Sequence, residues 1–129
     1  MDPQTAMDMI AQAATLTDHL DTQAAEWLLR WAGDQVSGLL ESVVDEELAQ
    51  GKLNALMAVM RKLNQIADNR QFKTPDALVE DVRIFVLLYT NLFGQSYMPR
   101  TSDLRRTVKA ILRQPTRDML AYLLEFAAS

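Results

Sequence analysis

The segment "VRIFVLLYTNLFG", residues 82–94, constrains the fold most strongly, because nine of its thirteen side chains are large and apolar. Thr74 suits an N-cap, Pro75 suits a first helical turn, and Gly94 suits a left-handed stop. These signals enclose residues 75–93, a length too great for a typical strand. The segment is also too short, and too charged at its start, for a bilayer span. We therefore predict a helix over 75–93 that other helices surround.

Helical periodicity extends over the rest of the chain. Apolar residues recur at spacings of three and four over five further segments, namely 3–16, 22–49, 52–68, 103–113 and 116–127. Gly33 and Gly38 interrupt the second segment, which is either one kinked helix or two helices with Asp34 capping the second. Gly51 is a reasonable stop signal. We predict one all-α domain over 1–129, a compact bundle of five to seven helices around 75–93.

Composition excludes several classes of protein. The 129 residues are 49% hydrophobic and 23% charged, which is typical of one globular domain. The absence of cysteine excludes disulfides, thiol chemistry and cysteine-built metal sites. No apolar run approaches the roughly 18 residues that a bilayer span needs, and the acidic N-terminus lacks the basic start of a signal peptide. We expect a cytoplasmic protein that does not contact a membrane.

Charge is distributed unevenly along the chain. Residues 1–50 carry a net charge of −9, residues 51–129 carry +5, and the whole chain carries −4. Such asymmetry between halves is typical of a protein that meets a charged partner. Alternatively, the two halves face each other within one fold, or they meet head to tail between copies.

Six basic side chains surround one predicted helix. Arg105, Lys109 and Arg113 fall one turn apart on 103–113, away from its apolar face, and we call these three the basic stripe. Three more bases lie beside or flank the stripe: Arg106, Arg100 and Arg117. Phosphate groups or an acidic protein surface would bind such a row, and the alternative is a solvated face. The sequence pI near 4.9 argues against broad, nonspecific DNA binding.

A second candidate surface lies in "ESVVDEELAQ". Its acidic patch consists of Glu41, Asp45, Glu46 and Glu47. Asp45, Glu46 and Glu47 lie near the C-terminal end of the predicted 22–49 segment, where their charge would oppose the helix dipole, and a rule broken in this way favours a basic partner. The same carboxylates would also suit a hard cation, although a solvated acidic face is the simpler interpretation.

Trp27 and Trp31 form the third candidate surface. They lie four residues apart on one side of the 22–49 segment, away from its main leucine face. Such a pair is either part of the core or, if exposed, an aromatic docking surface.

Signatures of enzymes and of metal sites are missing. The lone histidine, His19, has no Glu three residues before it, as a di-iron bundle requires. The chain has no Gly-x-Ser-x-Gly elbow and no glycine-rich phosphate loop. We therefore expect no enzyme, no metal and no cofactor.

Four segments follow one another in an order that resembles the small helical subunit of type III CRISPR effector complexes: "LNALMAVMRKL", "LVEDVRIFVLLYTNLFGQ", "DLRRTVKAIL" and "DMLAYLLEF". The resemblance covers residues 52–128 and consists of helix lengths and apolar spacing; the acidic first 50 residues depart from it. In that family a short helical protein lines an RNA-bound filament and contacts the RNA backbone through basic residues. The resemblance thus implies an RNA partner for the basic stripe.

Three functional hypotheses follow, of which the third is a metal-assisted enzyme that uses Glu41, Asp45 and Glu46. The first is a small non-enzymatic interaction or adaptor protein that docks through charge-complementary surfaces on protein partners or on itself. The alternative is a subunit of a larger nucleoprotein complex that contacts an RNA or DNA backbone.

Overall fold

The computed structural model describes residues 20–129, except Val43 and Ser96, together with six earlier residues: Gln4, Asp8, Ala11, Gln12, Thr15 and Thr17. Within this part of the chain there is no strand and there are five helices: α2 (Thr22–Ser42), α3 (Glu46–Asn69), α4 (Pro75–Phe93), α5 (Thr101–Leu112) and α6 (Thr116–Ala128). The prediction of an all-α bundle is confirmed. The predicted helix 3–16 lies largely outside the described residues.

The ends of α4 lie where the local signals predicted them. The Thr74 hydroxyl accepts a hydrogen bond from the Ala77 N–H at 3.2 Å, and Pro75 occupies the first turn. At the other end Gly94 has a φ of 69°, a left-handed conformation that glycine adopts without a steric penalty. Its N–H donates to the Thr90 carbonyl, which closes the helix.

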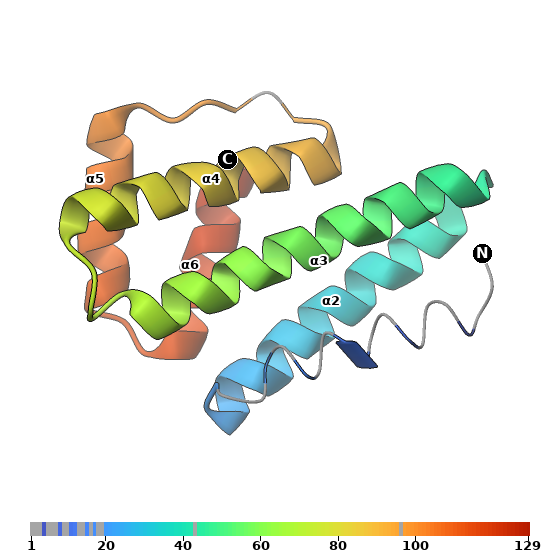
Figure 1. Ribbon diagram of the computed structural model, residues 1–129, viewed down its shortest axis with the longest axis horizontal. Helices are drawn as coiled ribbons and strands as arrows, with labels where there is room; N and C mark the ends of the chain where they lie inside the picture. Colours follow the sequence, from blue (N-terminus) through green and yellow to red (C-terminus); the bar gives the residue numbers. More distant parts are fainter. Residues whose placement is uncertain are drawn as a thin grey trace.

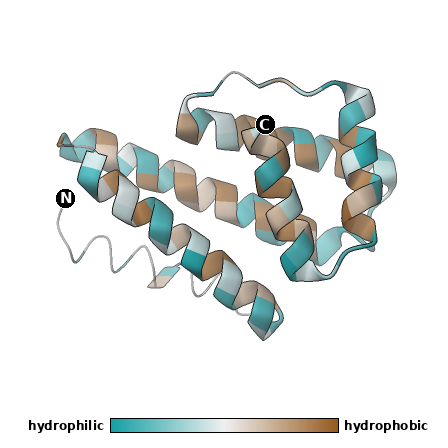
Figure 2. Ribbon diagram, turned by 180° about the vertical axis from the view of Figure 1, so that it is seen from behind, coloured by the Kyte–Doolittle hydropathy of each residue, from teal (hydrophilic) through white to brown (hydrophobic). Residues whose placement is uncertain are grey.

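The helices pack around one core. α4 contacts α3, α5 and α6, while α2 contacts α3 and α6 (Figure 1). Figure 2 shows apolar residues where the helices meet and hydrophilic residues on their outer faces. Phe85 of α4 is fully buried, together with leucines from the other four helices: Leu28, Leu53, Leu63, Leu104, Leu120 and Leu123. Burial of each such side chain contributes about 1.5–3 kcal/mol.

One face of α4 departs from the prediction. Ile84 and Leu87 are exposed, and they lie on one row with the exposed Glu80 and Asn91. The helix is therefore central to the bundle but is not enclosed on every side. Its other apolar faces are enough to hold it between three helices. The prediction from its composition therefore overestimated how much of its surface is buried.

The 22–49 segment also differs from the prediction. α2 runs through Gly33 and Gly38 without interruption, so Asp34 caps no second helix, and α3 continues through Gly51. The break lies between Ser42 and Glu46 instead. A Cβ at each of the three glycines would meet nothing within 4 Å, so they occupy open faces. There each costs only about 1 kcal/mol, which the packing of the buried faces offsets.

A buried arginine joins three helices. Arg70, which follows α3, is 7% exposed, and its Nη1 donates to the Ile111 carbonyl at 2.8 Å. Its Nη2 donates to the Thr116 hydroxyl at 3.4 Å. Burial lowers the pKa of Arg70, against the opposing effect of the Asp21 charge. A cation at the end of α5 and the start of α6 satisfies a helix carbonyl and fixes the angle between these two helices.

A second buried charge joins α3 to α4. Asp81 accepts hydrogen bonds from Lys62 at 3.1 Å and from Lys73 at 2.7 Å. Burial alone would raise the pKa of Asp81, but the hydrogen bonds and charges of the two lysines lower it below its ordinary value. The ionised carboxylate therefore stabilises the packing of these two helices.

Candidate docking surface

The basic stripe lies on the outer face of α5. The helix buries the opposite face, which carries Leu104, Thr107, Val108 and Ile111. All three stripe residues are exposed, and none of their side chains forms an ion pair or hydrogen bond within the part of the chain that the structure describes. The positions that the sequence predicted for Arg105 and Lys109 on α5 are thus observed, and Arg113 is the helix C-cap. Their charge is available to a partner.

The other three bases have separate surroundings. Arg106 pairs with Asp103 at 3.7 Å, and Arg117 pairs with Asp118 at 3.5 Å. Arg100 is the exposed N-cap residue of α5, and its side chain makes no capping bond. The six bases therefore do not act as one continuous row.

A pocket of about 180 Å³ lies between the start of α4 and α5. Its lining consists of Pro75, Asp76, Val79, Arg105, Val108, Lys109 and Leu112, and we call it the α4–α5 pocket. Aliphatic side chains from both helices form its walls, and two stripe cations stand beside them. An apolar concavity with a few charged groups is the usual form of a binding site for a ligand or a partner's side chain.

The pocket was not predicted, because its walls come from helices that are distant in sequence. Val79 and Leu112 meet only through the packing of α4 against α5. Helical spacing predicts an inward position for Leu112, four residues after the buried Val108, and this prediction is wrong because the residue is 37% exposed.

The acidic patch has a different local setting from the predicted one. Asp45 is the N-cap of α3, and its carboxylate accepts a hydrogen bond from the Leu48 N–H at 3.0 Å. Glu46 and Glu47 lie in the first turn of α3, where negative charge stabilises the helix dipole. The prediction that Asp45, Glu46 and Glu47 oppose a helix C-terminus is wrong, because α2 ends at Ser42, and only Glu41 of the patch lies in its last turn. Their charge therefore has a structural explanation of its own.

Exposed apolar side chains accompany the acidic patch. Val44 is 98% exposed and Leu48 is 55% exposed. Val44 occupies the position before the N-cap, from which an apolar side chain usually packs onto the first turns of its own helix. Because the Val44 side chain is almost fully exposed, it does not pack onto α3 in this way. We call this region, formed by Glu41, Val44, Asp45, Glu46, Glu47 and Leu48, the acidic end.

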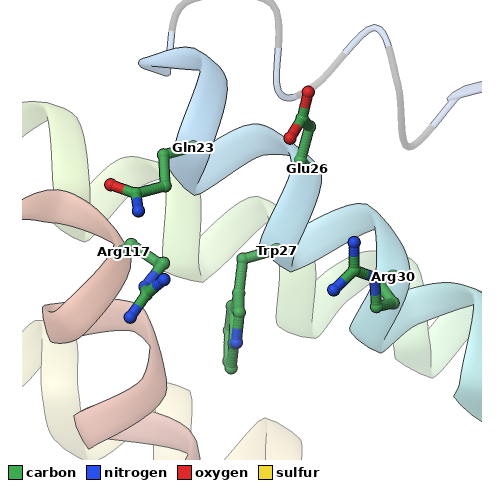
Figure 3. A pocket seen from close by; sticks show the side chains of 5 residues that line it. All are labelled: Gln23, Glu26, Trp27, Arg30 and Arg117. Carbon is green, nitrogen blue, oxygen red and sulfur yellow. The ribbon is translucent and has the colours of Figure 1, made fainter.

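The two tryptophans lie at the edge of the core. Trp27 and Trp31 are half-buried and pack against the core. Trp27 also lines a second pocket of about 230 Å³, in which Figure 3 shows its ring with Arg117 on one side and Arg30 on the other. Gln23 and Glu26 complete this lining. Arg117 thus faces α2 rather than the basic stripe.

The described residues form neither a candidate metal site nor a membrane-spanning helix. Within these residues, no three His, Cys, Asp or Glu side chains lie close enough to hold a metal ion. His19 lies outside the described residues. None of the helices described is both long and apolar enough to span a membrane.

No family model, curated protein or solved structure matches this chain. The resemblance to the type III CRISPR small subunit stays a prediction from the order of helices. Function is therefore inferred from the surface of the chain itself.

Proposed function

We propose that this protein is a non-enzymatic interaction module that binds an acidic, partly apolar protein surface at the α4–α5 pocket. One observation carries the proposal: Arg105 and Lys109, exposed and without partners among the described residues, stand beside an apolar concavity. We further propose that this binding takes place in the cytoplasm, in keeping with a sequence that has no cysteine.

The two components of the pocket would contribute differently to binding. Burial of a partner's aliphatic group against Val79, Val108 and Leu112 would supply most of the affinity, at about 25 cal/mol per Å² of apolar area. Arg105 and Lys109 would attract acidic partners, speed association and disfavour basic ones. A surface of this composition matches the apolar centre and charged rim of a protein interface.

A nucleic-acid backbone suits the same surface less well. Asp76 lines the pocket and would oppose phosphate and carboxylate alike, so it does not decide between the two partners. Asp103 and Asp118 already pair with Arg106 and Arg117, which leaves fewer cations for a phosphate row. Phosphates would also gain nothing from the aliphatic walls. We therefore favour a protein partner, with RNA or DNA binding as a competing outcome of the test.

The test compares two variants that lose the same charge. Immobilised protein is exposed to a nuclease-treated extract of the source cells, and the retained proteins are identified by mass spectrometry. The Arg105→Ala/Lys109→Ala variant removes two cations from the pocket. The Arg30→Ala/Arg61→Ala variant removes two exposed cations from α2 and α3. We expect a partner that wild type and the control retain and that the pocket variant loses.

Two results would contradict the proposal. One is retention of the same proteins by both variants. The other is tight binding of a labelled oligonucleotide at about 50 mM salt, with a steep salt dependence that the pocket variant flattens. The second result would establish the nucleic-acid alternative instead.

A further inference from the structure

We infer that the partner at the α4–α5 pocket is a second copy of this chain, whose acidic end inserts Val44 or Leu48 into the pocket. This inference rests on the proposed function and names the partner. It makes the contact heterologous, because two different surfaces of the same protein meet.

The acidic end has the chemistry that the pocket requires. Two exposed aliphatic side chains, Val44 and Leu48, lie directly beside Asp45, Glu46 and Glu47. The stretch 31–51 contains five acidic residues and no Lys or Arg, and none of its acids forms an ion pair among the described residues. An aliphatic group flanked by carboxylates complements aliphatic walls flanked by an arginine and a lysine.

Both surfaces are open in the single chain. Val44 lacks the contact with its own helix that its position normally provides, and its exposure of 98% leaves its apolar surface in water. The α4–α5 pocket, of about 180 Å³, is large enough for one valine or leucine side chain. Insertion would remove both apolar surfaces from water in one contact.

The positions of the two surfaces require two molecules. Figure 1 shows α5 and the start of α4 at one end of the long axis, and the junction of α2 with α3 at the other end. The acidic end therefore cannot reach the pocket of its own chain. A dimer formed in this way would leave one acidic end and one pocket unoccupied. Further copies would therefore add head to tail as the concentration rises.

The net charges of the two halves fit the same arrangement. The first 50 residues carry −9 and the remainder carries +5, and within the described chain the acidic patch and the basic stripe lie at opposite ends. Charge separated in this way favours alternating contact between copies, and added salt would weaken that contact.

Variants with one disabled end test the inference by sedimentation velocity. Val44→Lys/Leu48→Lys disables the acidic end, and Arg105→Glu/Lys109→Glu disables the pocket. All four positions are exposed, so both variants are expected to fold, which circular dichroism would verify. Ile84→Lys serves as the control, because Ile84 is an exposed aliphatic residue on the open face of α4.

Wild type and the Ile84→Lys control are expected to sediment faster as protein concentration rises at low salt. Each single-end variant should remain a monomer. An equal mixture of the two variants should form a dimer and nothing larger, because the mixture retains one intact acidic end and one intact pocket per pair.

Three results would overturn the inference. The first is a wild-type chain that stays monomeric at about 1 mM, where a contact with a millimolar dissociation constant already occupies more than a third of the ends. The second is association of either variant alone, and the third is a mixture that stays monomeric. The proposed function would survive each of them if the extract experiment still yielded an acidic protein that depends on Arg105 and Lys109. The two failures are therefore distinguishable.

Discussion

Replacement of Asp81 by asparagine gives the sharpest test of the packing between α3 and α4. The Asp81 side chain is 11% exposed, and it binds Lys62, whose side chain is 15% exposed, and Lys73, whose side chain is 39% exposed. The substitution keeps the shape of the side chain and removes its charge. It therefore isolates the electrostatic part of the interaction.

The magnitude follows from the different exposure of the two lysines. A hydrogen bond to a charged group contributes about 1.5–3 kcal/mol, and Lys62 has little access to water that could replace it. Lys73 is more exposed and can turn to solvent, so its pair contributes about 1 kcal/mol or less. We expect Asp81→Asn to lower the free energy of unfolding by about 3 kcal/mol at neutral pH.

The assay is urea denaturation followed by tryptophan fluorescence, with Glu80→Gln as the control. Glu80 is the adjacent acid, and its exposed side chain pairs with Arg83 one turn away. Its replacement should change the free energy of unfolding by less than about 0.5 kcal/mol. Equal effects of the two substitutions would refute the account of the α3–α4 packing.

Dependence on pH gives a second readout of the same pair. Because the pKa of Asp81 is lower in the folded chain than in the unfolded chain, its contribution is complete above about pH 4. The contribution is lost as the pH falls through the folded pKa. The difference between wild type and Asp81→Asn should therefore shrink in acid, and a difference that does not change with pH would contradict the assignment.

Three further predictions concern stability and use the same denaturation assay. Arg70→Met should lower the free energy of unfolding by about 2–3 kcal/mol, because it removes a charged hydrogen bond to the end of α5; an effect below about 0.5 kcal/mol would contradict this. Gly94→Ala should destabilise by about 1–2 kcal/mol at its positive φ, whereas Gly51→Ala should stabilise the interior of α3 by up to about 1 kcal/mol. The same sign for both glycines would be inconsistent with the observed helix ends. Phe85→Ala should destabilise by about 3–5 kcal/mol and Phe72→Ala hardly at all, and a comparable loss from the exposed Phe72 would show that the core is misplaced.

Local signals account for the parts of the fold that the sequence predicted. Thr74, Pro75 and Gly94 act on α4 through hydrogen bonds and backbone angles within a few residues. The bounds of that helix can therefore be predicted without the rest of the chain. The junction of α2 and α3 was mispredicted because glycine propensity is a weak effect. Gly33 and Gly51 lie on open helix faces, and the signal that starts α3 is the Asp45 cap, which the prediction had placed inside the 22–49 segment.

Interactions between residues that are distant in the sequence could not be predicted from it. Arg70 acquires its role only where the end of α5 and the start of α6 meet it, about forty residues further along the chain. The exposure of Arg105 and Lys109 could be predicted from helical spacing, but the pocket beside them required the contact between α4 and α5. The acidic end was predicted as a charged segment, and only the structure revealed how fully its Val44 is exposed.

The most direct measurement of the head-to-tail contact is disulfide trapping, because the natural sequence has no cysteine. A Val44→Cys chain and a Leu112→Cys chain would each carry one thiol, at the acidic end and in the wall of the pocket respectively. When equal amounts are mixed and mildly oxidised, the account predicts that the disulfide joining the two different variants predominates. Formation of all three dimers in the proportions of random collision would contradict it.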